Sequence, residues 1–436
     1  MRAEWSRLGF ILATIGSAVG LGNLWRFPYI VGENGGGAFL IPFAICAIFF
    51  GMPLMMLEFA AGRRFQGSVI TSLKRIDPRL RFLGLIPIGV TVVIFSYYLV
   101  ITGWVLSYLA FSVIGYADFS EYTASYLPLI AFFASLLLVL YIVQFDIKAG
   151  IERANTYLMP LLFLFVLIMF FEALTLPGLG EAVAYYLAPE IAALASPRIW
   201  LMAAGQVFFS FSAGFGILIT YGSYLSKKED IPASTMMIAG TDVVVALMAG
   251  LIIFPIVFTF GFDPVSGPGL AFITLPAIFS VMPLGFIFGP MFFLLLLIGA
   301  ISSLVSMMEV GVAALVDEAR FSRRRATLLI ASLVAILGLP SALSYAGWEI
   351  IVMGRPFLDT VDLLFGTLLL PLVAALLVVG IAWFWNPEEI LEEINRSSRV
   401  QFPGITIILL RFVIPVILVV VFAFFIVGLM LGLDVV

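Results

Sequence analysis

About eleven apolar segments, each long enough to cross a lipid bilayer, follow one another along this chain of 436 residues. The chain is 63% hydrophobic and only 11% charged, and its mean hydropathy is +1.19. A water-soluble fold of this length would need many more charged side chains on its exterior. The sequence therefore predicts an all-α integral membrane protein. The expected spans are residues 8–33, 37–61, 83–113, 127–145, 155–175, 198–225, 231–261, 284–315, 326–344, 356–385 and 404–433.

The rest of the composition excludes several classes of function. The chain has one cysteine, Cys46, so no intramolecular disulfide is possible, and it has no histidine, the commonest proton shuttle and transition-metal ligand. No cleavable signal, phosphate-binding glycine loop, nucleotide-binding domain or basic nucleic-acid arm is apparent. We therefore expect no organic cofactor and no nucleic-acid partner. Any transport must draw on an ion gradient or run downhill.

The positions of the basic residues predict the orientation in the membrane. With a cytoplasmic N-terminus, most of the 22 Lys and Arg residues fall in cytoplasmic segments. Only Arg198 and Arg355 fall in outside loops, while Arg26 and Arg411 lie within spans. We expect a multi-pass protein of the plasma membrane. An odd number of spans then places the C-terminus outside the cell.

Two spans contain glycine-rich runs that favour a break in the helix. Residues 16–23 read GSAVGLGN, and residues 209–216 read FSFSAGFG. Glycine weakens a helix interior by roughly 1 kcal/mol relative to alanine. The two breaks are five spans apart, and a repeat with an odd number of spans must be inverted in the membrane. Paired broken helices of this kind point to a transporter binding site at the midplane.

This pattern predicts a single transmembrane domain, residues 1–436, with inverted five-helix repeats and broken helices 1 and 6. Repeat one is expected at about 8–175 and repeat two at about 198–385, with an additional helix at about 404–433. The stretch 267–283 is apolar but short, so we interpret it as a re-entrant or capping hairpin outside the membrane.

An unwound segment exposes backbone carbonyls that can bind a hard cation, and amides that can bind a carboxylate. Side chains around the two breaks offer oxygen for a cation: Asn23, Ser210, Asp242, Ser302 and Ser303. Oxygen ligation suits alkali and alkaline-earth ions rather than zinc or copper.

Each of these features also has a structural explanation. Small residues permit close helix packing, and serines often bond back to their own helix. Asp242 is different, because an unpaired charge in a membrane costs several kcal/mol and needs a partner. Arg26 and Asp362 are buried charges of opposite sign, and pairing with each other would satisfy both.

Four longer motifs resemble those of the neurotransmitter:sodium symporter family, specifically its prokaryotic amino-acid branch, which includes a bacterial leucine transporter. They are GSAVGLGNLWRFP at 16–28, ENGGGAF at 33–39, GQVFFS at 205–210 and GLAFITLP at 269–276. The resemblance covers nearly the whole chain. It implies ten core helices in two inverted repeats, and sodium-coupled symport of an amino acid rather than enzymatic activity.

The resemblance also implies two sodium sites. The first would use the Ala18 carbonyl with the side chains of Asn23, Ser210 and Asp242, and Thr241 is a rival because the alignment there is uncertain by one residue. The second site would use the following carbonyls and hydroxyls: Gly16, Val19, Gly299, Ser302 and Ser303.

The implied substrate site lies between the same breaks. The carboxylate would rest on amides near Leu21 and Gly22, beside the Tyr98 hydroxyl and the first sodium with its ligand Ser210. The amine would meet the carbonyls of Ala18, Phe209 and Ser212. The side-chain pocket would be lined by Ser17, Ile94, Phe209, Phe215, Ser303 and Met307. This lining is mainly apolar and aromatic, so a hydrophobic or aromatic amino acid fits best.

Gly20 favours an amino acid over an amine, because amine transporters of the family carry Asp there. The implied gates are Arg26 with Asp362 outside, near Phe209, and Arg2 with Asp317 inside, near Trp5 and Tyr224. Alternating access would rock helices 1, 2, 6 and 7 against the rest.

Chloride independence is a further expectation. Phe43 stands where chloride-dependent relatives carry Tyr, although Gln206 and Ser210 are retained, and Asp242 supplies a fixed negative charge. The same charge could take a proton on the return step.

Three other functions remain as alternatives. A sodium-independent exchanger or proton-coupled carrier of the same fold is disfavoured by the hydroxyls of Ser302 and Ser303. A membrane sensor is disfavoured because no signalling domain is attached. An integral-membrane enzyme is disfavoured because no nucleophile–base pair or metal cluster converges.

Overall fold

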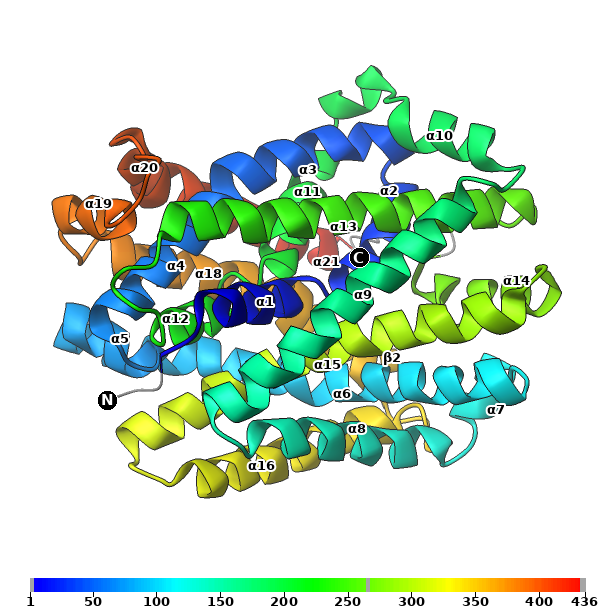
Figure 1. Cartoon of the computed structure of the whole chain (residues 1–436), viewed down its shortest axis with the longest axis horizontal. Coiled ribbons are helices and arrows are strands. Elements are labelled where there is room, and N and C mark those ends of the chain that lie inside the picture. The colour runs from blue at the N-terminus through cyan, green and yellow to red at the C-terminus, as the bar shows by residue number, and fades with distance from the viewer. Residues whose placement is uncertain (1–3, 264–266, 432–436) are drawn as a thin grey trace.

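The computed structural model describes residues 4–263 and 267–431, and most of them are helical (Figure 1). The described residues include eight helices long and apolar enough to cross a membrane, or nine if the pair Arg7–Ala18 and Gly22–Glu33, bent by 44°, forms one span. The prediction of a helical multi-span membrane protein is confirmed. A two-stranded antiparallel ribbon, β1 Ile351–Val352 and β2 Arg355–Pro356, is the sheet structure in this part of the chain.

The first half of the chain supplies the following helices, where η marks a 3-10 or π segment: α1 Arg7–Ala18, η1 Gly22–Arg26, α2 Phe27–Glu33, η2 Gly36–Phe39, α3 Leu40–Cys46, η3 Ala47–Gly51, α4 Met52–Phe65, α5 Val69–Ile76, η4 Pro78–Arg81, α6 Leu85–Ile114, α7 Phe119–Thr123, α8 Leu127–Val143, η5 Ile147–Glu152, α9 Arg153–Ala173, α10 Leu179–Leu187 and η6 Ile191–Ala195.

The second half supplies these: α11 Pro197–Ser210, α12 Ile217–Gly222, α13 Ile231–Thr259, η7 Gly267–Leu270, α14 Thr274–Val281, α15 Gly285–Glu318, α16 Arg323–Leu343, α17 Phe357–Val361, η8 Asp362–Leu369, α18 Leu370–Ala382, α19 Pro387–Asn395, α20 Ile405–Ile408, η9 Leu409–Val413 and α21 Ile414–Met430.

Two predicted spans lie outside those nine because their helices are short. Helix α8 has 17 residues, and the segment 198–225 divides into α11, with 14 residues, and α12, with 6. Two segments between the predicted spans contain short helices. Helix α7 lies within 114–126, and α10 within 176–197, where Tyr186 donates a hydrogen bond to the Leu247 carbonyl of α13 at 3.3 Å. Packing against a long neighbour stabilises a helix too short to form alone.

The helices form two groups that meet at the breaks. Helices α6, α8, α15 and α16 pack on one another and fill the lower part of Figure 1. Helices α3, α4, α11, α12 and α13 form the other group. Helix α1 lies between them in the middle of the molecule, in contact with α9, α13 and α15. The break after Ala18 therefore falls at the centre of the bundle.

Basic residues gather at one end of the bundle, which we call the basic end. There Arg63 pairs with Glu393 at 2.7 Å, Arg323 with Glu309 at 2.6 Å, and Arg7 with Glu229 at 3.5 Å. Helices α5 and α19 lie at this end, on the left of Figure 1. Helices α7 and α14 lie at the opposite, distal end, on the right.

The stretch 267–283 forms a short cap rather than a span, as the sequence predicts. Its described part contains η7 and α14, and Phe272 between them is buried. The Phe272 ring lies 5.8 Å from Trp25 and 5.6 Å from Trp104, centroid to centroid. The cap thus packs over the distal half of helix 1.

Candidate functional site

Helix 1 is broken between Ala18 and Gly22. Val19 adopts an extended conformation, with φ −78° and ψ 91°, and the amides of Asn23 and Leu24 both donate to the Gly20 carbonyl at 3.2 Å. Helix α15 approaches closely here, because a Cβ atom on Gly20 would lie 2.5 Å from the Ser303 hydroxyl. A larger residue at position 20 would therefore displace the Ser303 hydroxyl.

Helix 6 is broken between Ser210 and Ile217. Ser212, Gly214 and Gly216 all have positive φ, at 54°, 85° and 77°. The unwound backbone is held by side chains from other helices: Glu58 accepts a hydrogen bond from the Gly214 amide at 2.9 Å, and Thr91 donates one to the Phe215 carbonyl at 2.8 Å. Sequence reasoning missed Glu58, although a carboxylate within a predicted span is itself a signal.

Three buried polar side chains meet beside the two breaks. The Asn23 amide nitrogen lies 2.8 Å from Asp242 Oδ1 and 3.0 Å from Ser210 Oγ. The Ser210 hydroxyl lies 2.9 and 2.8 Å from the two Asp242 oxygens. Thr241 is not part of this group, because its hydroxyl donates to the Met237 carbonyl of its own helix at 2.8 Å. The structure thus brings Asp242, and not Thr241, to the predicted first sodium site.

A second polar group joins α1 to α15. Ser303 donates to the carbonyls of Gly299, at 3.1 Å, and Ser17, at 3.3 Å. A Cβ atom on Gly299 would lie 3.3 Å from the Val19 carbonyl, and one on Gly16 would lie 2.0 Å from Ser302 Oγ. The five residues predicted for the second sodium site are therefore neighbours.

Ser302 also reaches α9, where its hydroxyl donates to the Asn155 side chain. Asn155 is buried, and sequence reasoning missed it because its position relative to the breaks depends on how α9 packs. Ser303 bonds back to the Gly299 carbonyl one turn earlier on its own helix, as serines in membrane helices often do, whereas Ser302 bonds to another helix. Both polar groups contain oxygen atoms that could ligate a cation, and oxygen ligands suit a sodium ion.

A small central cavity of about 20 Å³ lies between the two groups. It is lined by Ser17, Ala18, Gly20, Gly22, Tyr98, Phe209, Ser210, Ser212, Phe215, Ser303 and Met307. These include the predicted substrate residues except two: Leu21, which lines the larger cavity described next, and Ile94, which is buried in α6. Since this volume admits about one water molecule, neighbouring side chains must move to admit an amino acid.

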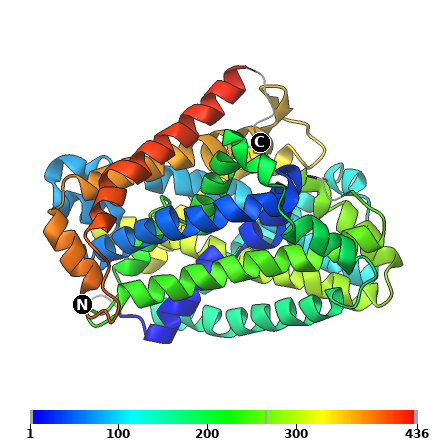
Figure 2. The same ribbon diagram turned by 90° about the horizontal axis from the view of Figure 1, so that it is seen from above.

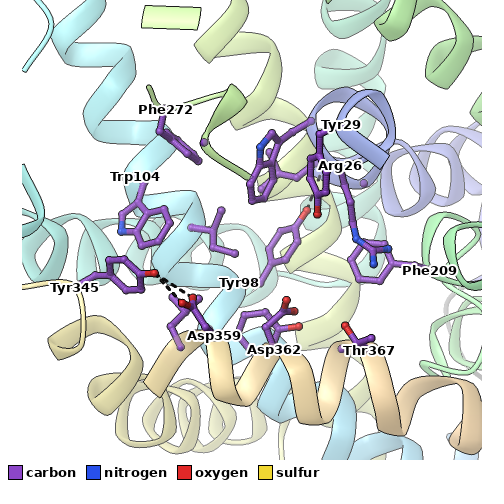
Figure 3. A pocket seen from close by; sticks show the side chains of 18 of the residues that line it. Arg26, Tyr29, Tyr98, Trp104, Phe209, Phe272, Tyr345, Asp359, Asp362 and Thr367 are labelled. Carbon is purple, nitrogen blue, oxygen red and sulfur yellow. Dashed lines mark hydrogen bonds between the residues drawn. The ribbon is translucent and has the colours of Figure 1, made fainter. Parts of the chain in front are cut away.

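A larger cavity of about 360 Å³, which we call the vestibule, lies on the distal side (Figure 3). Aromatic side chains dominate its lining: Trp25, Tyr29, Trp104, Phe119, Phe272 and Tyr345. Tyr98 and Phe209 line both cavities, so they separate the vestibule from the central cavity. The Tyr98 hydroxyl also accepts a hydrogen bond from the Leu21 amide at 3.3 Å, on the broken segment of helix 1.

The predicted outer gate residues face each other across the vestibule without touching. Arg26 donates to Gln206 at 3.0 Å, and its guanidinium lies 4.8 Å from the centre of the Phe209 ring. Asp362 lines the opposite wall (Figure 3). Within the described part of the chain no ion pair links Arg26 to Asp362. The expectation that they neutralise each other is therefore not met in this conformation, because Gln206 holds the guanidinium.

The predicted inner gate is only partly visible. Arg2 lies outside the described residues, and Asp317 accepts a hydrogen bond from the Ser68 amide at 2.6 Å. Trp5 packs edge-on against Tyr224, with ring centroids 6.1 Å apart, as the sequence predicts.

Sequence reasoning missed Glu309 at this end. The Glu309 carboxylate accepts a hydrogen bond from Tyr224 at 2.8 Å and pairs with Arg323 at 2.6 Å. Its signal was available, since an acidic residue within a predicted span needs a partner just as Asp242 does. These contacts compensate the Glu309 charge at the basic end.

Comparison with known proteins adds the family to this geometry. Residues 2–127 and 127–432 match the profile of the sodium:neurotransmitter symporter family. The chain belongs to this family. The resemblance seen in the sequence motifs is thereby confirmed, and the protein is a sodium-dependent membrane transporter rather than an enzyme.

Several relatives of the transporter align over almost their whole length. It is 35% identical over 436 residues to an uncharacterized sodium-dependent transporter of Bacillus subtilis, covering 96% of each protein. It is 36% identical over 428 residues to an uncharacterized sodium-dependent transporter of Methanocaldococcus jannaschii, covering 92% of this chain and 85% of the relative. The crystal structure of MhsT in complex with L-phenylalanine superposes with a TM-score of 0.88 at 38% identity, covering 97% of this chain and 99% of MhsT.

Proposed function

We propose that the transporter performs sodium-coupled symport of an amino acid into the cell, and that the substrate has a hydrophobic or aromatic side chain. The observation that carries this proposal is the convergence of Asn23, Ser210 and Asp242 where the two broken helices meet, beside a cavity lined in part by Phe209, Phe215 and Met307. The crystal structure of MhsT with phenylalanine, at 38% identity, supports the substrate class.

In the proposed first sodium site, Asp242 supplies the negative charge. The Asn23 amide and the Ser210 hydroxyl now donate to this carboxylate. Turning the amide and rotating the hydroxyl would present oxygen atoms to a cation instead, together with the Ala18 carbonyl. A buried carboxylate favours such an ion strongly, because it otherwise lacks a compensating charge.

The proposed second sodium would sit between α1 and α15, on the carbonyls of Gly16, Val19 and Gly299 and the hydroxyls of Ser302 and Ser303. Helix α1 belongs to helices 1, 2, 6 and 7, which alternating access would rock, and α15 belongs to the rest. A ligand shifts such an equilibrium only by binding one arrangement more tightly. Sodium at this junction would do so by bridging helices that separate in the other arrangement.

The substrate carboxylate would meet the amides of Leu21 and Gly22, where Tyr98 already accepts from Leu21. Its amine would meet the carbonyls of Ala18, Phe209 and Ser212. The aromatic and thioether side chains of Phe209, Phe215 and Met307 would enclose an apolar side chain.

We further propose that the chain has eleven spans in two inverted repeats plus one helix, and that the basic end faces the cytoplasm. The grouping of Arg7, Arg63, Arg81 and Arg323 at that end supports this orientation. It places the N-terminus inside and the end of α21 outside, and it opens the vestibule to the outside.

Sodium is expected to be required for substrate binding. The reason is that the proposed ligands are oxygens around a buried carboxylate, and the substrate carboxylate would share the first ion. Equilibrium binding of labelled phenylalanine in sodium, lithium and potassium buffers would measure this, and we expect strong binding only in sodium. Equal affinity in all three would favour a sodium-independent exchanger or a proton-coupled carrier.

Arg26→Ala and Asp362→Ala are each expected to reduce uptake, with strongly non-additive effects. The proposal requires the two charges to pair when the vestibule closes, although Gln206 holds Arg26 here. Uptake by the single and double variants forms a double-mutant cycle. Gln206→Ala is a comparison variant that keeps both charges, and it removes the bonds of Gln206 to Arg26 and to the Gly22 carbonyl. Purely additive losses would mean that Arg26 and Asp362 never interact.

A further inference from the structure

The ribbon of β1 and β2 ends in a turn with an unexpected residue at its tip. Val352 pairs with Arg355, so Met353 and Gly354 form a two-residue loop, with φ of 55° and 74°. Two successive positive φ values define a type I′ turn, which normally carries Asn-Gly or Asp-Gly. A methionine in the left-handed region is conformationally costly. Met353 is nevertheless 64% exposed, so packing within the chain does not account for it.

The residues around this tip form an exposed apolar patch, which we call the ribbon patch: Trp348, Ile351, Val352 and Met353. Their exposed fractions are 62%, 58%, 39% and 64%. Exposed apolar residues gathered on a loop mark a contact site.

The ribbon stands at the boundary of the membrane. It follows α16, which ends at Leu343, and leads directly into α17, which begins at Phe357, and both neighbours belong to helices long and apolar enough to span. In Figure 2 the gold ribbon lies at the edge of the outline. Tryptophan is enriched at this depth of a bilayer, and exposed charges such as Glu349 and Arg355 suit the headgroup layer.

The ribbon is also held firmly to the helix that it precedes. The Phe357 amide donates to the Ile350 carbonyl at 2.8 Å, and Thr360 donates to the Val352 carbonyl at 2.8 Å. The Gly347 amide donates to the Thr123 carbonyl at 3.0 Å, which ties the loop to α7. A patch fixed in this way presents its apolar residues in a constant direction.

We propose that the ribbon patch is an interfacial anchor that inserts into the boundary between lipid headgroups and acyl chains, with Met353 deepest. Burial in that layer would offset the conformational cost of methionine at the turn. The anchor would fix the loop that carries Tyr345, whose hydroxyl donates to Asp359 at the vestibule wall at 3.0 Å. This assignment concerns the lipid surface and does not depend on the transported substrate.

A nitroxide at position 353 tests the proposal directly. Cys46 is buried and is the only cysteine, so Met353→Cys in a Cys46→Ser background gives one label site. In proteoliposomes, we expect a several-fold higher ratio of collisions with oxygen, which dissolves in lipid, to collisions with a water-soluble nickel chelate than at a control label, Glu121→Cys on α7. A ratio equal to the control would overturn the proposal. Protection from both agents would also overturn it, in favour of a protein partner or a second copy of the chain.

Trp348 provides a second measurement without a label at the turn. The emission of Trp348 is obtained by subtracting the spectrum of Trp348→Phe from that of the wild-type protein. We expect brominated phospholipids to quench this emission. The same variant reports on folding through its thermal stability in detergent. Unquenched Trp348 emission would place the patch in water or against protein and would contradict the anchor.

Discussion

Gly20→Asp is expected to abolish amino-acid uptake. Gly20 lines the central cavity, and a Cβ atom there would lie 2.5 Å from Ser303 Oγ and 3.3 Å from the Tyr98 hydroxyl. A carboxylate at this point would stand beside the proposed position of the substrate carboxylate. Two like charges about 4 Å apart repel by about 4 kcal/mol at an effective dielectric of 20, which corresponds to roughly a thousandfold loss of affinity.

Gly20→Asn separates charge from size, because its side chain has the shape of Asp without the charge. Both variants crowd Ser303, so the difference between them isolates the electrostatic effect. Uptake of labelled phenylalanine into proteoliposomes would be compared at equal amounts of folded protein, judged by thermal stability. If Gly20→Asp retains wild-type uptake, the substrate does not bind there. If Asn and Asp lose uptake equally, the loss is steric.

The breaks of helices 1 and 6 could be predicted because their cause is local. Three glycines within residues 16–22, and Gly214 with Gly216, weaken the helix where they stand. The positive φ values of both Gly214 and Gly216 agree with this reason. Asp242 could be singled out for a similar reason, because a charge within an apolar span needs a partner wherever the span packs.

The partners of these residues could not be predicted in the same way, because they come from other helices. Glu58 on α4 holds the Gly214 amide, and Asn155 on α9 accepts from Ser302. Which face of each helix turns toward the breaks depends on packing, and the all-round apolar pattern of a buried span leaves that face unmarked. The same reason explains why Gln206, and not Asp362, holds Arg26 in this conformation.

Thr241 and Asp242 illustrate what three-dimensional geometry adds. Neighbouring residues on an α-helix point about 100° apart, so only one of the two can face the breaks. The structure turns Asp242 inward, where it is fully buried, and leaves Thr241 partly exposed and bonded to Met237. The geometry therefore places Asp242, and not Thr241, beside the breaks.

Chloride is expected to be dispensable, and this follows from the charge at the proposed site. A sodium ion and a zwitterion together bring a net positive charge into a buried site, where an uncompensated charge costs several kcal/mol. Asp242 supplies the balancing negative charge. A bound chloride would lack one hydroxyl donor, since Phe43 has no hydroxyl and packs against Phe27 with centroids 4.7 Å apart. Gln206 is also engaged, because its amide group donates to the Gly22 carbonyl at 2.9 Å.

Asp242→Asn should therefore show a large, diagnostic loss. Asn has nearly the same shape and can still bond to Asn23 and Ser210, so the fold should persist while the charge disappears. Wild-type uptake is expected to be unchanged when gluconate replaces chloride, whereas the variant should lose uptake in gluconate and either stay inactive or regain activity as chloride is added. Thr241→Val is the matched control, because it changes the neighbouring residue without touching the site, and it should transport normally. A wild-type protein that stops working in gluconate, or an Asp242→Asn variant that works fully without chloride, would refute the role assigned to Asp242, since the positive charge would then have to be balanced elsewhere.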